Sequence, residues 1–355
     1  MKNGKIAIGL LSIFIMVFTG SQLLMGQTVK KPYKIVHLAN RFGTVMYTEA
    51  TAFEQIFKKS GSWIEYTVRE TPGAMYNNKF LFQNKDKMKS GKMPPVITSS
   101  SASIMGYTNG GRPPFKKIPT AYFQAVFSSA AFVSLFMTFD SNIKSTKDLI
   151  GKKVGIPQKA RIFSSTLFLK PYFDKGLGIW KKVDWQYIGA INSKDALLND
   201  RIDARLSNFR AKVELVNGTY ICTKLAPAAP ALEILGSGKK VQMFGFDPAV
   251  IKKSYNFSKD MTIYPVLIKK GAAEWIKKDT WATLALGVYR VPDFLPREVV
   301  KELIRVRYEY RDELAKYHKA LGLMPDNPYP LGVPDKWVQP EVKNAMNELG
   351  ITIPK

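Results

Sequence analysis

Residues 130–165 constrain the fold more than any other part of the chain, because they contain a strand, a short helix, a second strand and the start of a second helix in close succession. The apolar run 131–139 has the length and the Phe and Val content of a buried strand. Ser145 and Asp148 then predict the first turn of a short helix, which Gly151 ends. Strands and helices that alternate with short loops indicate parallel sheets covered by helices.

The second half of this stretch predicts a loop that faces a ligand. A short strand over 153–156 is broken by Pro157, and the polar segment 158–165 follows it. Ser164 can cap the next helix, which we expect over 166–173. The first N–H groups of a helix lack intrahelical partners, and ligands of open α/β sheets lie beyond the carboxyl ends of the strands. The loop is therefore a candidate binding segment.

The same stretch resembles a known class of proteins. An apolar strand followed by D-S-x-I-K-S-x-K-D-L-x-G-K-K-V-G-I-P is similar to the opening of the second lobe of bilobed periplasmic solute-binding proteins. Within that superfamily the chain is most similar to the TAXI family, the soluble receptors of one class of TRAP transporter. This choice rests on Gly43, Thr44 and Tyr47 in a loop that enters a helix, and on residues 290–300, which resemble the phrase R-x-x-L-P-E-D-V-V. The resemblance covers about residues 33–350.

The resemblance implies an α/β fold of the periplasmic-binding-protein-like type II class, in which two α/β lobes are joined by crossing strands and a ligand cleft lies between them. We expect residues 27–130 and 278–355 to form lobe 1 and residues 131–277 to form lobe 2. The crossing strands are expected near Ala131 and Trp281, and the second of them is predicted as one strand over 281–290.

Two later segments add to this expectation. Residues 209–231 are longer than the family pattern. Residues 290–300 are predicted to lead into a long helix that runs to about Tyr317, because Val299, Leu303 and Val306 fall on one face and charged residues on the other. Such a helix lies on the surface and packs its apolar face inward.

The N-terminal residues 1–26 have the order of a secretory signal peptide. Lys2 and Lys5 precede an apolar core over 6–18, and small residues follow it. We expect cleavage near residue 26 and a periplasmic protein; an uncleaved membrane anchor is the alternative, and it would leave the same domain outside the membrane. The only cysteine, Cys222, excludes an internal disulfide.

The composition of the chain limits the classes of partner that we expect it to bind. The chain has 355 residues, 46% of them hydrophobic, which is enough for two domains with sizeable cores. Its net charge of +25 raises nucleic acid or an anionic membrane as partners. The lysines, however, are scattered singly and in pairs such as Lys58-Lys59 and Lys181-Lys182, a pattern typical of solvated faces. We therefore expect no nucleic-acid partner.

The candidate ligand-binding residues of the first lobe follow three predicted strands, over 34–38, 63–69 and 96–101. A strand, a Gly-containing loop and a helix start form a cradle for an anion or a polar ligand. In the first loop, Arg41 and Phe42 stand where the family has small residues. The hydroxyls at the end of the third strand offer ligand contacts, and a turn that caps the helix near Ile104 is the alternative. The candidates in this lobe are Asn40, Arg41, Phe42, Gly43, Thr44, Tyr47, Thr71, Gly73, Ser99 and Ser100.

The candidates of the second lobe are Gln158, Arg161, Ser164 and Asn208. Asn208 falls where amino-acid receptors of the superfamily often have an acidic residue for the substrate ammonium, so a free amino acid is disfavoured. Arg41 and Arg161 lie in opposite lobes, and arginine can hold a carboxylate through a bidentate pair. A solvent-facing loop arginine is the alternative for each. We expect a small anionic solute, specifically a carboxylate.

Catalytic signals are sparse. His37 lies in a strand and His318 at a helix end, and neither has a second ligand at metal spacing in the sequence. Cys222 has no nearby histidine, and no phosphate-binding, dinucleotide or nucleophile-elbow motif occurs. We expect a core histidine, a surface histidine, no cofactor, no metal and no enzymatic activity; an enzyme on a bilobed scaffold is the less favoured alternative.

The resemblance implies a function as a monomeric solute receptor. Such a receptor captures its small-molecule solute by closing the cleft and delivers it to an integral membrane permease, here of the TRAP type. A receptor of an ABC transporter with the same fold is the alternative, and the sequence separates the two poorly.

Overall fold

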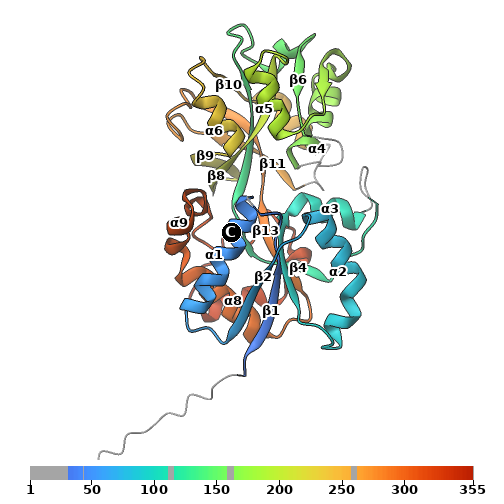
Figure 1. Ribbon diagram of the computed structural model, residues 1–355, viewed down its shortest axis with the longest axis vertical. Coiled ribbons are helices and arrows are strands. Elements are labelled where there is room, and N and C mark those ends of the chain that lie inside the picture. Colours follow the sequence, from blue (N-terminus) through green and yellow to red (C-terminus); the bar gives the residue numbers. More distant parts are fainter. Residues whose placement is uncertain (1–30, 43, 111–115, 158–163, 257–261, 355) are drawn as a thin grey trace, which may run out of the picture. The chain divides into compact units, whose positions relative to one another are not determined.

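The computed structural model describes residues 31–42, 44–110, 116–157, 164–256 and 262–354 (Figure 1). The predicted signal and the candidates Gly43, Gln158 and Arg161 lie outside these residues. No helix within the described ranges is long and apolar enough to cross a membrane.

The first sheet has the strand order β2-β1-β3-β13-β4. Strands β1, β2 and β3 are parallel, and β13 runs antiparallel between β3 and β4. Its strands are β1 (Tyr33–Leu38), β2 (Ile64–Arg69), β3 (Val96–Ser101), β4 (Phe123–Ser128) and β13 (Gly287–Pro292). The main helices that follow or cover them are α1 (Val45–Lys59), α2 (Ala74–Lys89), α3 (Ala102–Gly110), α8 (Arg297–Glu309) and α10 (Glu341–Glu348).

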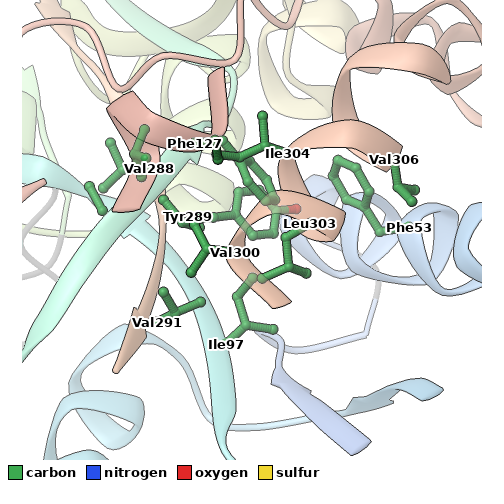
Figure 2. Close-up of a cluster of buried hydrophobic side chains, with 14 of the residues drawn as sticks. Phe53, Ile97, Phe127, Val288, Tyr289, Val291, Val300, Leu303, Ile304 and Val306 are labelled. Carbon is green, nitrogen blue, oxygen red and sulfur yellow. The ribbon is translucent and has the colours of Figure 1, made fainter. Parts of the chain in front are cut away.

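The core of the first lobe joins the N-terminal and C-terminal parts of the chain. Figure 2 shows side chains from α1, β3, β4, β13 and α8 in one cluster. Tyr289 lies near its centre, where its ring stacks on Phe127 at 4.5 Å and contacts the edge of Phe53 at 5.3 Å. Leu303 and Val306 of α8 are buried in the same cluster, as their helical spacing predicts. The lobe therefore cannot form before the C-terminal third of the chain is present.

The second sheet has the order β10-β5-β12-β11-β9-β8-β6-β7, with an additional pairing of β5 with β8. Its strands are β5 (Ala131–Thr138), β6 (Lys153–Gly155), β7 (Asp184–Gln186), β8 (Ala204–Val216), β9 (Thr219–Pro227), β10 (Gln242–Phe244), β11 (Ile263–Ile268) and β12 (Thr280–Ala285). The helices on it include α4 (Ser164–Lys170), α5 (Ala190–Leu198), α6 (Ala229–Leu235) and α7 (Pro248–Asn256).

The two lobes repeat one topology. Strands β7-β6-β8-β5-β10 have the same directions as β2-β1-β3-β13-β4, with the fourth strand antiparallel in both. In each lobe that antiparallel strand adjoins the crossing between the sheets. This arrangement of two α/β lobes confirms the predicted type II fold class.

A closed circuit of strands distinguishes the second sheet. Strand β5 pairs with β12 and with β8, and the pairings β12–β11, β11–β9 and β9–β8 complete the ring. Residues 209–231, which we expected to be longer than the family pattern, supply most of the β8–β9 hairpin of this ring. The turn of the hairpin is Asn217-Gly218, whose positive φ angles of 48° and 73° suit a tight hairpin connection.

The predicted single strand over 281–290 is wrong, because it is two strands in different sheets. Strand β12 pairs in the second sheet, β13 begins at Gly287 in the first, and Leu286 lies between them. A Cβ atom on Gly287 would lie 2.7 Å from the carbonyl oxygen of Ala130, which belongs to the other crossing connection. The two crossings therefore pass in backbone contact, and only glycine permits this.

Three helix predictions need correction. The helix expected to reach Tyr317 ends at Glu309, where the backbone of Tyr310 leaves the helical region, and shorter helical turns follow. The helix expected over 166–173 begins at Ser164 and ends at Lys170, because Pro171 has no N–H to continue it; a π-helical turn follows. The sequence after Pro72-Gly73 predicts a helix over 75–82, and the observed helix α2 begins at Ala74 and extends to Lys89.

Candidate ligand-binding site

Three helices of the first lobe start directly after parallel strands. Helices α1, α2 and α3 follow β1, β2 and β3, whose carboxyl ends lie at one edge of the sheet. The first N–H groups of each helix lack intrahelical partners, and the helix dipoles add positive partial charge at this edge. The predicted first-lobe candidates with described positions belong to these three connections and the strand and helix ends beside them.

The loop before α1 is held by its own hydrogen bonds. Thr44 caps the helix: its Oγ1 accepts from the N–H of Tyr47 at 3.3 Å and donates to the carbonyl of Arg41 at 2.7 Å. The N–H of Phe42 donates to Glu70 at 3.0 Å, and the Phe42 ring contacts the edge of Tyr47 at 5.5 Å. Phe42 is 76% exposed, and Arg41 is also exposed. The loop thus presents an aromatic surface beside the start of α1.

The loop before α2 brings three candidates together. Gly73 is the N-cap of α2 with φ 129°, a conformation that glycine tolerates, and it supplies no capping side chain. A Cβ at Gly73 would lie 3.7 Å from Oδ1 of Asn40, so Asn40 lies beside the start of the helix. That oxygen is buried and accepts no hydrogen bond. Thr71 is buried and donates to the carbonyl of Ala39, which ties this loop to the first one.

The candidates after the third strand belong to the strand itself. Ser99 and Ser100 are both in β3, where they pair with Tyr289 and Val288 of β13. The alternative of a helix-capping turn at these positions is therefore wrong. Both serines are buried, and Oγ of Ser100 has no hydrogen-bond partner. A buried hydroxyl without a partner is costly, so Ser100 is suited to contact a polar ligand.

In the second lobe, Asn208 belongs to a polar row across three neighbouring strands. Thr283 of β12 pairs with Ser134 of β5, which in turn pairs with Asn208 of β8. Ser134 donates to Oδ1 of Asn208 at 2.6 Å. The amide of Asn208 is uncharged, so this row offers no counter-charge to an ammonium group. Oγ1 of Thr283 is buried without a partner.

An ion pair that sequence reasoning missed links the lobes. Nη2 of Arg210 on β8 lies 3.7 Å from Oε2 of Glu49 on α1 and 3.2 Å from the sulfur of Met46. The guanidinium lies 4.2 Å above the ring of Phe132, and Oε1 of Glu49 accepts from Ser129 at 2.7 Å. Both charged side chains are buried. Burial lowers the pKa of Arg210, and the negative charge of Glu49 opposes that shift.

Two further contacts connect the second sheet to the C-terminal segment. Nζ of Lys212 lies 2.8 Å from Oδ2 of Asp326, and the hydroxyl of Tyr264 donates to the carbonyl of Gly332. Like the Arg210 pair, they join residues far apart in the sequence, which local patterns cannot reveal.

The remaining second-lobe candidate with a described position is Ser164, which opens α4. It is the first residue of the helix, where it was expected as a cap.

His37, His318 and Cys222, the side chains considered for catalysis, all have described positions. His37 is fully buried, its Nδ1 lies 2.9 Å from the hydroxyl of Tyr66, and burial lowers its pKa to about 3. His318 is exposed and accepts from the N–H of Ala320. These are the core and surface histidines that were predicted. Burial raises the pKa of the Cys222 thiol to about 12, which makes it a poor nucleophile. Within the described ranges no group of three or more His, Cys, Asp or Glu side chains could hold a metal.

Comparison with known proteins gives one family match. The family model described as NMT1/THI5 like matches residues 118–252, which run from before β4 into α7. No curated protein matches the chain.

The chain is also similar to several solved structures with weak sequence identity. A TctC solute-binding protein from Polaromonas has 12% identity over 90% of this chain and 88% of its own, with a TM-score of 0.46. MatC of Rhodopseudomonas palustris with bound malate has 13% identity over 90% and 97%, with a TM-score of 0.47. A putative sulfonate-binding SsuA from Methylobacillus flagellatus has 13% identity over 92% and 98%, with a TM-score of 0.49. The fold assignment itself rests on the repeated strand order.

Proposed function

We propose that the chain is an extracytoplasmic receptor that captures a small anionic solute, specifically a carboxylate, and delivers it to a membrane permease. The observation that carries this proposal is the convergence of three helix starts at one edge of the first sheet, with the buried and unpartnered oxygens of Asn40 and Ser100 beside them. The helix starts and the Ser100 hydroxyl can donate to a polar ligand that accepts hydrogen bonds, and the Asn40 oxygen can accept from a hydroxyl group of such a ligand.

The charge of the site favours an anion over an ammonium ion. The candidate residues of both lobes include Arg41 and Arg161 but no acidic side chain. Asn208 stands in the polar row with its oxygen already bonded to Ser134. The net charge of +25 further attracts anions to the surface. A zwitterionic amino acid would find no counter-charge for its ammonium group among these residues.

Closure of the two lobes is the proposed capture step. A ligand shifts a conformational equilibrium only through contacts that differ between the two states. The Arg210–Glu49 pair supports a closed arrangement, because it joins β8 of the second sheet to α1 of the first lobe. A solute that touches both the first-lobe loops and the polar row favours the same arrangement.

The transporter partner is proposed from sequence resemblance. The TAXI-like loop and the segment 290–300 favour a TRAP permease, and an ABC transporter is the alternative. Reconstitution with the permease encoded beside this chain separates the two, because TRAP transport requires an ion gradient and ABC transport requires ATP. N-terminal sequencing of the periplasmic protein tests cleavage near residue 26.

Isothermal titration calorimetry of the mature protein against carboxylates, sulfonates and amino acids tests the receptor function. We expect a carboxylate to bind, and we expect Asn40→Ala and Ser100→Ala each to weaken binding at least ten-fold. Asn347→Ala, at an exposed position of α10, is the matched control and leaves affinity unchanged. Binding of amino acids alone would refute the anion assignment, and chemical conversion of the bound solute would refute the receptor function.

A further inference from the structure

Four arginines of the described residues are more than nine-tenths buried: Arg205, Arg210, Arg290 and Arg307. Three of them have partners. Arg290 donates from all three of its nitrogens to Phe123, Asn78 and Thr120. Arg307 donates to the carbonyl of Pro325, and Arg210 lies beside Glu49. Arg205 differs from the other three.

Arg205 is a buried cation that finds no hydrogen-bond acceptor for Nε or Nη1 among the described residues. It is 2% exposed, and its Nε and Nη1 atoms have no hydrogen-bond partner. Burial lowers its pKa to about 10, and no carboxylate opposes that shift, yet the group stays charged at neutral pH. Ser207, two residues along the same strand, is 1% exposed and its Oγ also lacks a partner. Since an uncompensated buried charge is strongly unfavourable, these groups call for an anion.

The side chain of Arg205 starts beneath α5. Successive side chains of a strand alternate between its faces, so Arg205, Ser207 and Phe209 share one face of β8. Phe209 packs in the same apolar cluster as Leu197 of α5. A Cβ on Gly155 would lie 3.6 Å from the Cβ of Arg205 and 2.7 Å from the Cβ of Ser193 in the first turns of α5. Asn208 lies on the opposite face of the strand.

The start of α5 offers donors and no competing acid. Its N-cap is Gly189 with φ 85°, which supplies no capping side chain. The first turn contains no acidic residue. The helix has nine residues, so its first N–H groups and its dipole favour an anion there.

The corresponding place in the first lobe is closed by neutral groups. Helix α2 also has a glycine N-cap, and its fourth residue is Asn77, as Ser193 is the fourth residue of α5. Asn77 donates to Thr98 of β3 and to the carbonyl of Leu38, each at 2.9 Å. In the repeated topology β8 takes the place of β3, and there Arg205 stands without such bonds. The second lobe thus has a cation where the first lobe has the neutral, hydrogen-bonded side chains of Asn77 and Thr98.

We propose that Arg205 and Ser207, beneath the start of α5, bind a small oxyanion: a carboxylate, sulfate or phosphate group. A guanidinium binds two oxygens of such a group through a planar fork, either Nε with Nη2 or Nη1 with Nη2, and in Arg205 each fork contains one of the two unpartnered nitrogens. The Ser207 hydroxyl and the first N–H groups of α5 supply further donors. The oxyanion is either a free ion or one end of the captured solute; the second source rests on the proposed function.

Thermal unfolding of the mature protein and of Arg205→Met in low-salt buffer tests the site. Sodium sulfate, sodium phosphate and sodium acetate are compared with sodium chloride at equal ionic strength. We expect at least one oxyanion to raise the Tm of the wild type by about 2 °C or more, and to leave Arg205→Met unchanged. Arg205→Met should itself melt higher than the wild type when no oxyanion is present, because it removes an uncompensated charge.

Matched variants separate binding from general damage. Arg290→Met removes an equally buried but fully bonded arginine, so its Tm should fall in every buffer. Ser207→Ala and Arg205→Lys should keep the fold, checked by near-ultraviolet circular dichroism, and weaken oxyanion binding at least three-fold and ten-fold. An equal response of the wild type and Arg205→Met to every oxyanion overturns the proposal, as does a lower Tm of Arg205→Met without oxyanion.

The source of the oxyanion follows from one more variant. If sulfate or phosphate stabilises through Arg205 and Asn40→Ala retains that response, the site holds a free ion. If only carboxylates respond and both variants abolish the response, the site holds one end of the solute. If no solute binds in calorimetry while the inorganic response through Arg205 persists, the proposed receptor function fails and the oxyanion site stands.

Discussion

Arg210 on β8 and Glu49 on α1 form a buried pair in which Nη2 lies 3.7 Å from Oε2, and this pair joins the second sheet to the first lobe. Removal of one member of a buried pair leaves an uncompensated charge, which costs about 3–5 kcal/mol. We expect Glu49→Gln and Arg210→Met each to lower the free energy of unfolding by this order in urea denaturation. The double variant should recover part of the loss, and strictly additive losses would show that the two side chains are not coupled.

The buried His37 predicts a pH dependence of stability. Its pKa is lowered to about 3 in the folded state, against about 6.5 in the unfolded chain, so the unfolded state binds more protons between these values. The stability that comes from keeping this imidazole neutral is fully present above pH 6.5. As the pH falls below 6.5, the free energy of unfolding decreases by about 1.4 kcal/mol per pH unit. Urea denaturation from pH 4 to 8 should show this slope in the wild type and not in His37→Gln. His318→Gln, at an exposed histidine, should retain it.

The close passage of the two crossings predicts a cost at Gly287. A Cβ at this position would lie 2.7 Å from the carbonyl oxygen of Ala130, so Gly287→Ala must displace backbone. We expect a loss of about 1–3 kcal/mol in the free energy of unfolding. Gly236→Ala is the control, because its nearest neighbour is at 3.4 Å and its φ of −85° suits alanine. Equal losses in the free energy of unfolding for the two variants would show that the backbones of the two crossings can move apart at little cost.

A negative charge introduced at Asn208 should make the polar row unfavourable for an anionic solute. Asn208→Asp places a carboxylate beside Ser134, and like charges repel an anionic solute. We expect a loss of at least ten-fold in affinity for the carboxylate found by calorimetry, which is about 1.4 kcal/mol. Asn347→Asp adds the same charge at an exposed position of α10 and should change affinity little. Unchanged affinity in Asn208→Asp would place the solute away from this row.

Cys222 should report on opening of the strand ring. The thiol lies on β9 and is buried, and its pKa is raised to about 12, so little thiolate forms at pH 8. We expect iodoacetamide to modify it slowly in the native protein and rapidly in 6 M guanidinium chloride. Rapid modification of the native protein would show that the β8–β9 hairpin opens readily.

The sequence predicted those features that depend on neighbouring residues. The strands at 131–139 and 153–156 and the capping box of Ser145 and Asp148 occur because turn and capping chemistry acts over a few residues. The strand over 281–290 was mispredicted because both halves are apolar, and nothing local marks the change of sheet at Leu286. The sheet that each half joins depends on pairing partners that lie far away in the sequence.

The candidate site also contains some residues that the local sequence predicts and others that depend on distant contacts. Polar residues at the ends of β1, β2 and β3 were recognisable from the sequence, because they follow apolar strands directly. Arg210 and Arg205 were not, since an arginine in a strand looks like any solvent-facing cation. Only burial among distant residues sets them apart. The local alternation places both at positions that a buried strand normally fills with apolar residues, and that was the available signal.

The closed circuit of strands limits how the lobes can move. Because β5 is hydrogen-bonded along both edges, its second-lobe end cannot slide or twist without breaking the ring. Strand β12 is held in the same ring, so freedom remains only in the two links at Ser129-Ala130 and at Leu286. Two rigid lobes that are joined at two points can rotate relative to each other only about the line between those points.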